Sequence, residues 1–459
     1  MAFWRRHSRR GTLGPVLPWL AALALAQTCR PGEYWDTSMD MCMPGSAPAP
    51  SAPPPANARL WDLMTSPDGC AADGYYELGM SMCEPRPARP GRFSGMVMGN
   101  AFLAGIDEEG PRGRLALSSP NWLMGDVGVD LARWNRLELD AMLTAELWTT
   151  PSNGYPELLQ IGEDQSDGQP FLDAQHPHSS PIMGLTLTDV VALGAGGILR
   201  VFFAPRGEST DGPIAFMHRP TGTVNPDAPL GHHIGQDVGH ITSTALGAGL
   251  YLGHTIVEAS TFHGLEPQPT QVDLPLGAPD SAALRLSQIL GPHLTLSASG
   301  AYVNDPEGDP TVPHDWRLSA SAYGQADVLG SWRLHVFAAW GGMIGYDHAT
   351  FLDSFIGEAL LSDDRADQIW GRLEVLQRTP AELEVAGAPQ PDVGQWVGAL
   401  TLGYTRVVVS VWGFDFSAGV SGTASGVPDD YAVAYGHDVV FSGKVFLEAR
   451  FLRGFSVGG

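Results

Sequence analysis

Seven segments of this chain alternate apolar and polar residues with a period of two. In the clearest one, Asn135–Leu147, the odd positions from Leu137 onward are apolar and the even positions include Glu138 and Asp140. Trp332–Trp340 and Trp412–Ser421 repeat the pattern, with Trp and Phe among the apolar residues. A strand sends successive side chains to opposite faces, so each segment predicts a strand with one apolar and one polar face. Soluble sandwiches also alternate, but charges opposite a Trp- and Phe-bearing face favour an outer-membrane β-barrel. Weaker copies of the pattern lie at Asp315–Tyr323, His293–Tyr302, Gln395–Tyr404 and Gly443–Phe451.

Turn signals and long polar insertions punctuate residues 93–459, the region expected to form the barrel. Short turns are expected at Gly194–Gly197, Gly247–Gly249, Gly291-Pro292 and Leu329-Gly330. Longer polar insertions are expected at Thr150–Ser180, Pro205–Asp237, Gly264–Asp280, Asn304–His314, Thr379–Val393 and Thr423–Asp438. Brief turns that alternate with long loops are typical of outer-membrane barrels. The candidate strands number about 12 to 16 and antiparallel closure requires an even number, so an all-β transmembrane barrel of 14 or 16 strands is predicted. Ser354–Leu361 fits a helical turn, a strand or a loop equally well.

The composition narrows the possible partners. The chain has 26 basic and 50 acidic residues and a formal net charge of −24. Phosphate backbones need a basic surface, so nucleic acid is excluded as a partner, whereas cations would be attracted to a pore or loop. No apolar run reaches the 18 residues of a membrane-spanning helix.

The first 26 residues are predicted to be a secretory signal peptide. Four arginines precede an apolar stretch, Val16–Ala26, that ends in the small-residue pattern Ala-Leu-Ala. The mature chain would then start at Gln27 and be exported to the outer membrane, with the barrel-assembly machinery and outer-membrane lipid as partners. A lipoprotein anchored at Cys29 is a weaker alternative, because Ala26-Gln27-Thr28 poorly matches the residues that precede a lipidated cysteine. A twin-arginine signal is also weaker, because barrels cross the inner membrane unfolded.

Residues 27–92 contain a repeat. Cys29–Cys42 and Cys70–Cys83 each enclose 12 residues, carry an aromatic pair and end in Met-x-Met-Cys, and a Pro/Ala/Ser linker over 45–57 separates them. An even number of cysteines in an exported chain predicts disulfides, and the equal loops favour pairing within each repeat, although four cysteines allow three connectivities. The rival hypothesis is a soft-metal site for Cu(I), because thioether and thiolate ligands recur at close spacing. Its candidate ligands are Met39, Met41, Met80 and Met82, with the cysteines themselves.

Histidines gather in two of the predicted long loops. Neutral imidazoles beside a carboxylate can hold copper or zinc, but the spacing matches no known zinc signature, so histidines that only stabilise the loops are the alternative. The candidate metal ligands are His176, His178, His218, His232, His233, Asp237 and His240. No nucleophile elbow or phosphate-binding glycine loop is present, and no triad of nucleophile, base and acid stands out, so a non-enzyme is predicted, with no certain cofactor.

Three segments resemble motifs of an uncharacterised family of bacterial exported proteins. They are Leu158–Glu163 with Leu172–His178, Phe216–Pro220 with Asn225–His233, Asp237 and His240–Thr242, and Thr261–Pro267. The family is similar to outer-membrane β-barrels often encoded among copper and heavy-metal efflux genes, so the resemblance implies that fold and location, with no established activity. This chain departs at His263 and Leu265, and it has Gly235 where an aromatic residue is usual.

Together these observations predict an outer-membrane barrel that serves copper or related metal-ion binding, transport or resistance. Two alternatives stay open: a porin-like channel for small solutes with structural histidines, and a non-catalytic structural or surface protein.

Overall fold

A computed structural model describes residues 33–36, 41–44, 70 and 74–457, apart from short gaps at 165–169, 179, 270, 275, 307, 309, 346–348, 350, 364–365 and 389. The chain divides into two compact units, 1–49 and 50–459. In the first, β1 (Glu33–Asp36) pairs antiparallel with β2 (Met41–Pro44). The predicted signal peptide, Cys29, Met39, the 45–57 linker and the side chains of Met41 and Cys42 lie outside the described part of the chain.

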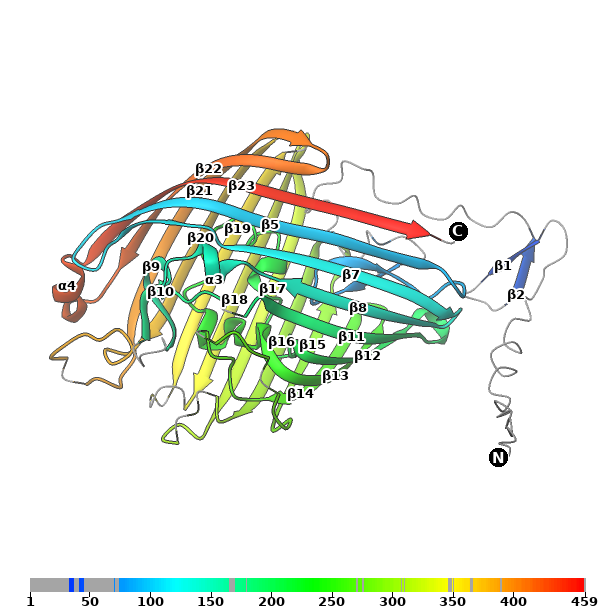
Figure 1. The fold of residues 1–459 in the computed structure, drawn as a ribbon, viewed down its shortest axis with the longest axis horizontal. Coiled ribbons are helices and arrows are strands. Elements are labelled where there is room, and N and C mark those ends of the chain that lie inside the picture. The colour runs from blue at the N-terminus through cyan, green and yellow to red at the C-terminus, as the bar shows by residue number, and fades with distance from the viewer. Residues whose placement is uncertain are drawn as a thin grey trace, which may run out of the picture. The chain divides into compact units, whose positions relative to one another are not determined.

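The second unit contains a closed antiparallel barrel (Figure 1). The short β6 and the longer β7 pair with the two halves of β5, so they share one position and the barrel has sixteen strand positions. The last strand, β23, closes it against β5, with Val457 opposite Phe93. The prediction of an all-β barrel of 14 or 16 strands is confirmed. The strands are β5 (Phe93–Glu108), β6 (Leu115–Ser118), β7 (Asn121–Ala132), β8 (Asn135–Leu143), β11 (Ile182–Ala192), β12 (Ile198–Gly207), β13 (Thr242–Leu252), β14 (Thr255–His263), β15 (Ser281–Ile289), β16 (Leu294–Asn304), β17 (His314–Leu329), β18 (Trp332–Ile344), β19 (Leu352–Asp363), β20 (Asp367–Arg378), β21 (Gln395–Val411), β22 (Phe414–Gly426) and β23 (Val439–Val457).

Short turns lie at the end of the barrel where β5 begins and β23 ends, and longer loops lie at the other end (Figure 1). The six predicted insertions all fall at the loop end, which also carries shorter loops at 109–114 and 345–351. One loop holds α3 (Glu146–Thr149) and the hairpin of β9 (Tyr155–Asp164) and β10 (Pro170–Gln175), and another holds α4 (Asp429–Tyr435). Among the described residues, no helix is long and apolar enough to cross a membrane.

The strand faces follow the predicted alternation. Leu139 is 43% exposed on the outside of β8, whereas its neighbour Glu138 is 2% exposed inside. In β18, Val336 faces out and His335 is fully buried in the lumen. The prediction is wrong at the ends of three segments. The strand β8 stops at Leu143 before α3, His293 lies in a 3-10 turn before β16, and Trp412 lies in the turn before β22.

Two other local expectations are resolved by the strand pairing. The predicted turn at Gly247–Gly249 is wrong, because both glycines lie inside β13. They are small for a packing reason: an added Cβ would lie 2.3 Å from the Phe202 ring at Gly247 and 2.9 Å from the Tyr251 ring at Gly249. The ambiguous segment at 354–361 is strand, since it lies within β19.

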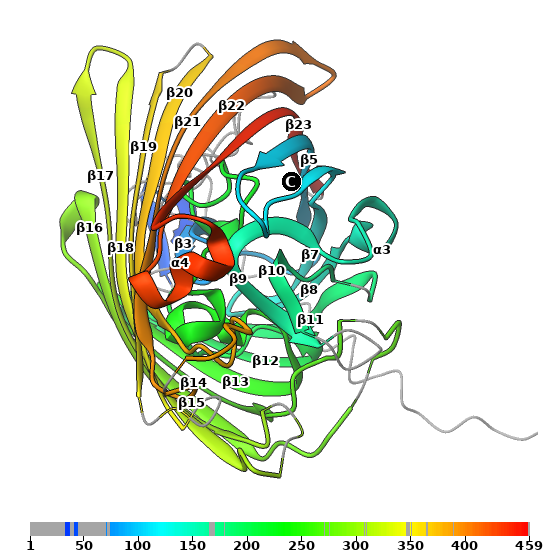
Figure 2. The same ribbon diagram turned by 90° about the vertical axis from the view of Figure 1, so that its left-hand side faces the viewer.

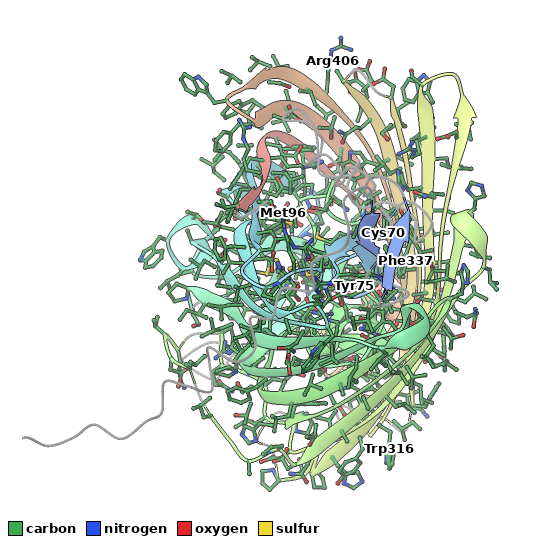
Figure 3. All side chains as sticks on the ribbon, turned by 90° about the vertical axis from the view of Figure 1, so that its right-hand side faces the viewer. Cys70, Tyr75, Met96, Trp316, Phe337 and Arg406 are labelled. Carbon is green, nitrogen blue, oxygen red and sulfur yellow. A yellow bond between two sulfur atoms is a disulfide. The ribbon has the colours of Figure 1, made fainter. Side chains whose placement is uncertain are left out.

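Three inserted segments fill the lumen. The loop between β12 and β13 folds inward, so residues 209–239 are all buried except the half-buried Phe216. The β9–β10 hairpin lies within the ring of strands at the loop end (Figure 2). The hairpin of β3 (Gly74–Glu77) and β4 (Met82–Pro85) enters from the turn end, where Figure 3 shows Cys70 and Tyr75 inside the barrel. The barrel is therefore occluded by its own chain.

Buried ion pairs fasten the inward loop to the barrel wall. The Arg219 guanidinium donates to both carboxylate oxygens of Glu358 on β19, at 3.1 Å each, and Thr221 adds a hydrogen bond of 2.7 Å to the same carboxylate. Arg372 on β20 also donates to Glu358, at 3.1 Å. Isolated buried charges are costly, and these mutual contacts are what make them tolerable. Further along the loop, Lys444 of β23 pairs with Asp227 at 2.5 Å.

The outer surface fits a bilayer. Trp134 and Trp412 are exposed at the turn end, and Trp148, Trp316 and Trp396 are exposed at the loop end. Figure 3 shows Trp316 pointing away from the barrel. Aromatic belts at both interfaces with an apolar band between them are the pattern of transmembrane barrels.

The first prediction concerns location. The mature chain is expected to fractionate with outer membranes and to migrate differently on gels before and after boiling, because a closed barrel resists detergent until heated. Recovery as a detergent-free periplasmic monomer would contradict the membrane assignment. Dependence on the barrel-assembly machinery stays a prediction, to be read from the loss of the heat-modifiable form when that machinery is depleted.

Candidate metal centre

Five of the predicted histidines meet inside the barrel. His176 and His178 follow β10, and His232, His233 and His240 lie on the inward loop. Their imidazoles form a closed ring in which each contacts two others. The distances between ring centroids are 5.6 Å for His176–His178, 5.8 Å for His178–His240, 4.2 Å for His240–His232, 4.7 Å for His232–His233 and 5.3 Å for His233–His176. We call this set the histidine ring.

Four of these imidazoles are oriented through one nitrogen. His232 Nδ1 lies 2.5 Å from an Asp237 carboxylate oxygen, and His240 Nδ1 lies 2.9 Å from the Asp237 carbonyl oxygen. His178 Nδ1 lies 2.8 Å from the Glu146 carboxylate, and His176 Nδ1 lies 3.4 Å from the Pro177 carbonyl. When Nδ1–H is donated in this way, the lone pair of a neutral imidazole is on Nε2.

The second ring nitrogen of each imidazole, Nε2, is the atom that could bind a metal ion. The Nε2 atoms of His176, His178, His232 and His240 are buried, and they form no hydrogen bond to any described residue. Histidines that bind metal almost always donate the other ring N–H to a carboxylate or a backbone carbonyl. Four of the five histidines of the ring have that arrangement.

Burial disfavours the charged form of three of the five imidazoles. Desolvation lowers the pKa of His176 to about 3, with neighbouring histidines adding to the effect. It also lowers the pKa of His233 and His240 well below the ordinary value. Burial alone would raise the pKa of Asp237, but His232 and Arg219 outweigh it and hold that carboxyl ionised. An anionic Asp237 beside the histidine ring suits a cation.

The other predicted ligands, His218 and Asp237, are not members of the ring. His218 is buried with Nε2 at 3.1 Å from the Glu208 carboxylate, beside the Trp122 ring. Both Asp237 oxygens are engaged, one with His232 and the other with the backbone N–H of Phe216 at 3.0 Å, so Asp237 orients the ring. Within the described residues, no three His, Cys, Asp or Glu side chains form a preformed metal-binding group. Coordination by the histidine ring therefore requires its side chains to rotate inward.

Sequence reasoning missed the role of Glu146. The period-two pattern extended the strand to Leu147 and made Glu146 one of its lumen-facing residues. In the structure Glu146 begins α3, and one of its carboxylate oxygens accepts from both the backbone N–H and the Nδ1 of His178. No sequence signal marked it, because the contact spans 32 residues.

The N-terminal hairpin carries the confirmed disulfide. Cys70 is bonded to Cys83, with 5.4 Å between Cα atoms, as the equal loops predicted. The Cys29–Cys42 pairing stays a prediction. Glu77 of this hairpin pairs with Arg200 of β12 and accepts from the Tyr251 hydroxyl at 3.2 Å. Met80 and Met82, the predicted soft ligands, lie in an apolar cluster of the lumen.

No family model and no curated protein matches this chain. Its fold is similar to solved outer-membrane structures. OmpF of Salmonella typhi, in complex with daunomycin, aligns with a TM-score of 0.50 and 8% identity over 78% of this chain and 97% of its own. OprB of Pseudomonas putida (TM-score 0.46, 12% identity, 79% and 94% covered) and the channel DcaP of Acinetobacter baumannii (0.46, 10%, 79% and 98%) are also similar.

At such identities the likeness is one of fold. The OmpF alignment and the closed barrel with its apolar exterior define this chain as an outer-membrane β-barrel protein. The resemblance to a family found among metal-efflux genes is not tested by these matches and stays a prediction.

Proposed function

We propose that this protein is a porin-class barrel whose lumen binds a transition-metal ion at the histidine ring, in the service of metal transport or resistance. The observation that supports this most is the set of four buried imidazoles whose Nδ1 atoms are held by carboxylate or carbonyl oxygens. Neutral imidazole suits Cu(II) and Zn(II). Asp237 and Glu146 would orient the ligands and raise their basicity.

A second candidate is a porin-like channel for small solutes whose histidines only pack the loop. The fold comparisons favour this candidate, because DcaP is an outer-membrane channel by name. The occluded lumen and the orientation of the imidazoles favour the first. Metal binding separates the two.

The second prediction tests the histidine ring. The His232→Ala/His233→Ala variant is expected to bind Zn(II) or Cu(II) at least about 100-fold more weakly, because loss of even an outer-shell partner typically costs 10–100-fold. The measurement is metal titration of the refolded barrel in detergent. His293→Ala, an exposed histidine beside a turn at the opposite end, is the matched control and should bind like the wild type.

Heat-modifiable migration must be retained for the double variant to be informative. His178→Ala, which removes a half-exposed member of the ring, gives a second and milder test. Full metal affinity in both variants would establish the histidines as scaffold and leave the small-solute channel.

The third prediction concerns pH. An ordinary histidine would lose metal as the pH falls through about 6.5, because a protonated imidazole cannot ligate. Burial lowers the pKa of His176 to about 3 and holds the pKa of His233 and His240 well below the ordinary value, so these three imidazoles stay neutral well below pH 6.5. Metal affinity is therefore expected to persist through pH 5 and to fall only as the pH approaches about 3. Titrations at several pH values check this, and a midpoint near 6.5 would contradict a buried site.

A further inference from the structure

Eight of the fourteen methionines of the chain gather in one cluster of the lumen. They come from the N-terminal hairpin, four adjacent barrel strands and the inward loop. Figure 3 places Met96 inside the barrel. The cluster, called here the methionine cluster, comprises Met80, Met82, Met96, Met98, Met124, Met142, Met183 and Met217.

The strand register aligns three of these residues in a row. Met98 of β5 is directly opposite Met124 of β7, and Met124 is directly opposite Met142 of β8. Directly opposite residues have Cβ atoms about 4.5–5.5 Å apart. A register shift between β8 and β11 then brings Met183, 4% exposed, into the same cluster. Thioethers thus line one wall of the lumen across four strands.

The wall borders a cavity of about 130 Å³, room for about four water molecules at about 30 Å³ each. Five of its lining residues are methionines: Met80, Met124, Met142, Met183 and Met217. The carboxyl groups of Glu77, Asp140, Glu208 and Glu258 also line it, against the two guanidinium groups of Arg200 and Arg285. Glu77 pairs with Arg200 and Glu258 pairs with Arg285, so Asp140 and Glu208 are the lining carboxyl groups in excess of the arginines.

The cavity borders the histidine ring through a shared lining residue. His240 lines it, and His240 also lines a smaller cavity with His176, His178 and His233. Met183 lines both of these cavities and a third one beside His176 and His178. An ion that leaves the imidazoles would meet thioethers next.

Methionine is also a common filler of irregular apolar gaps. A filler role predicts that methionines are spread among the packed regions. The other five apolar clusters of the described interior together contain one methionine, Met343. A filler role does not explain why eight methionines gather in one cluster and five of them line a polar cavity.

We infer that the methionine cluster is a second binding site of the lumen, selective for soft monovalent metal ions such as Cu(I) and Ag(I). Thioether sulfur is a soft ligand that prefers these ions to Zn(II). The site deepens the proposed function by adding the class of ion, but it uses different ligands from the histidine ring, so the two can fail separately.

The fourth prediction tests this site with Ag(I), which needs no reductant. The Met124→Leu/Met142→Leu/Met183→Leu variant conserves side-chain volume and removes three thioethers. Its Ag(I) affinity, measured on the folded barrel in detergent, is expected to fall at least about tenfold. Zn(II) affinity should stay within about twofold, because the imidazoles are untouched. X-ray absorption at the silver edge should show sulfur neighbours in the wild type and fewer in the variant.

Met343→Leu, a buried methionine outside the cluster, is the control and should not change Ag(I) affinity. Unchanged Ag(I) affinity in the triple variant, or a nitrogen-only silver shell in the wild type, would overturn the inference. Loss of Zn(II) binding in the His232→Ala/His233→Ala variant with Ag(I) binding kept would support both sites. If the triple variant does not fold, Met142→Leu alone should still weaken Ag(I) binding measurably, and an unchanged affinity there would overturn the inference too.

Discussion

Replacing Leu139 by arginine is expected to destabilise the folded barrel by about 2–4 kcal/mol, the cost of a cationic side chain on the lipid face near the bilayer midplane. Leu139 lies in the middle of β8, faces outward, and is flanked across the sheet by Val127 and Leu187. An arginine at this position cannot reach the lumen, because only alternate residues of the strand face inward.

The measurement is the free energy of unfolding in urea, with the barrel refolded into phospholipid vesicles. Asp140→Asn is the matched control at the next position, where the side chain faces the lumen. It should change the unfolding free energy far less and act on ion selectivity instead. A tolerated arginine together with an asparagine that prevents folding would mean that the two faces are inverted.

Replacing Glu358 by alanine is expected to free the inward loop and raise single-channel conductance. The substitution leaves the buried Arg219 and Arg372 without the carboxylate that joins them. Removal of one partner of a buried ion pair typically costs 3–5 kcal/mol. The strand ladder does not depend on this contact, so we expect the cost to appear as release of the loop while heat-modifiable migration is kept.

The control for this prediction is Asp327→Ala. Its ion pair with Arg333 lies at the turn end, with 76% of the Asp327 side chain exposed. Exposed pairs of this kind contribute at most about 1 kcal/mol. Conductance in planar bilayers should match the wild type for Asp327→Ala and exceed it several-fold for Glu358→Ala. A closed Glu358→Ala channel would show that other contacts of the loop, such as Lys444 with Asp227, hold it without Glu358.

The metal and porin-like hypotheses can both hold for one molecule. The lumen has the wall of an outer-membrane β-barrel, but inserted segments of the chain occupy the space through which a solute would diffuse. A barrel occluded in this way passes a bound ion only if ligands exchange or the loop moves. The Glu358→Ala variant therefore tests whether the inward loop blocks the lumen. The His232→Ala/His233→Ala variant tests whether the histidine ring binds metal.

The sequence by itself determined the strand faces, most turns and the positions of the long loops. These follow from local chemistry: the pleat imposes a period of two, and glycine and proline break strands wherever they occur in suitable turns. The turn predicted at Gly247–Gly249 was wrong. These glycines make room for the rings of Phe202 and Tyr251, and no local sequence pattern shows such a packing requirement.

Only the tertiary structure decided what meets in the lumen. His178 and His240 belong to different loops, and Met98, Met124 and Met142 belong to three strands. The histidines converge because ion pairs hold the inward loop against Glu358 and Lys444 of distant strands. The methionines converge because barrel closure sets their register. Such contacts depend on the pairing of segments far apart in the chain, so the residues themselves could suggest metal ligands but not which of them would share a site.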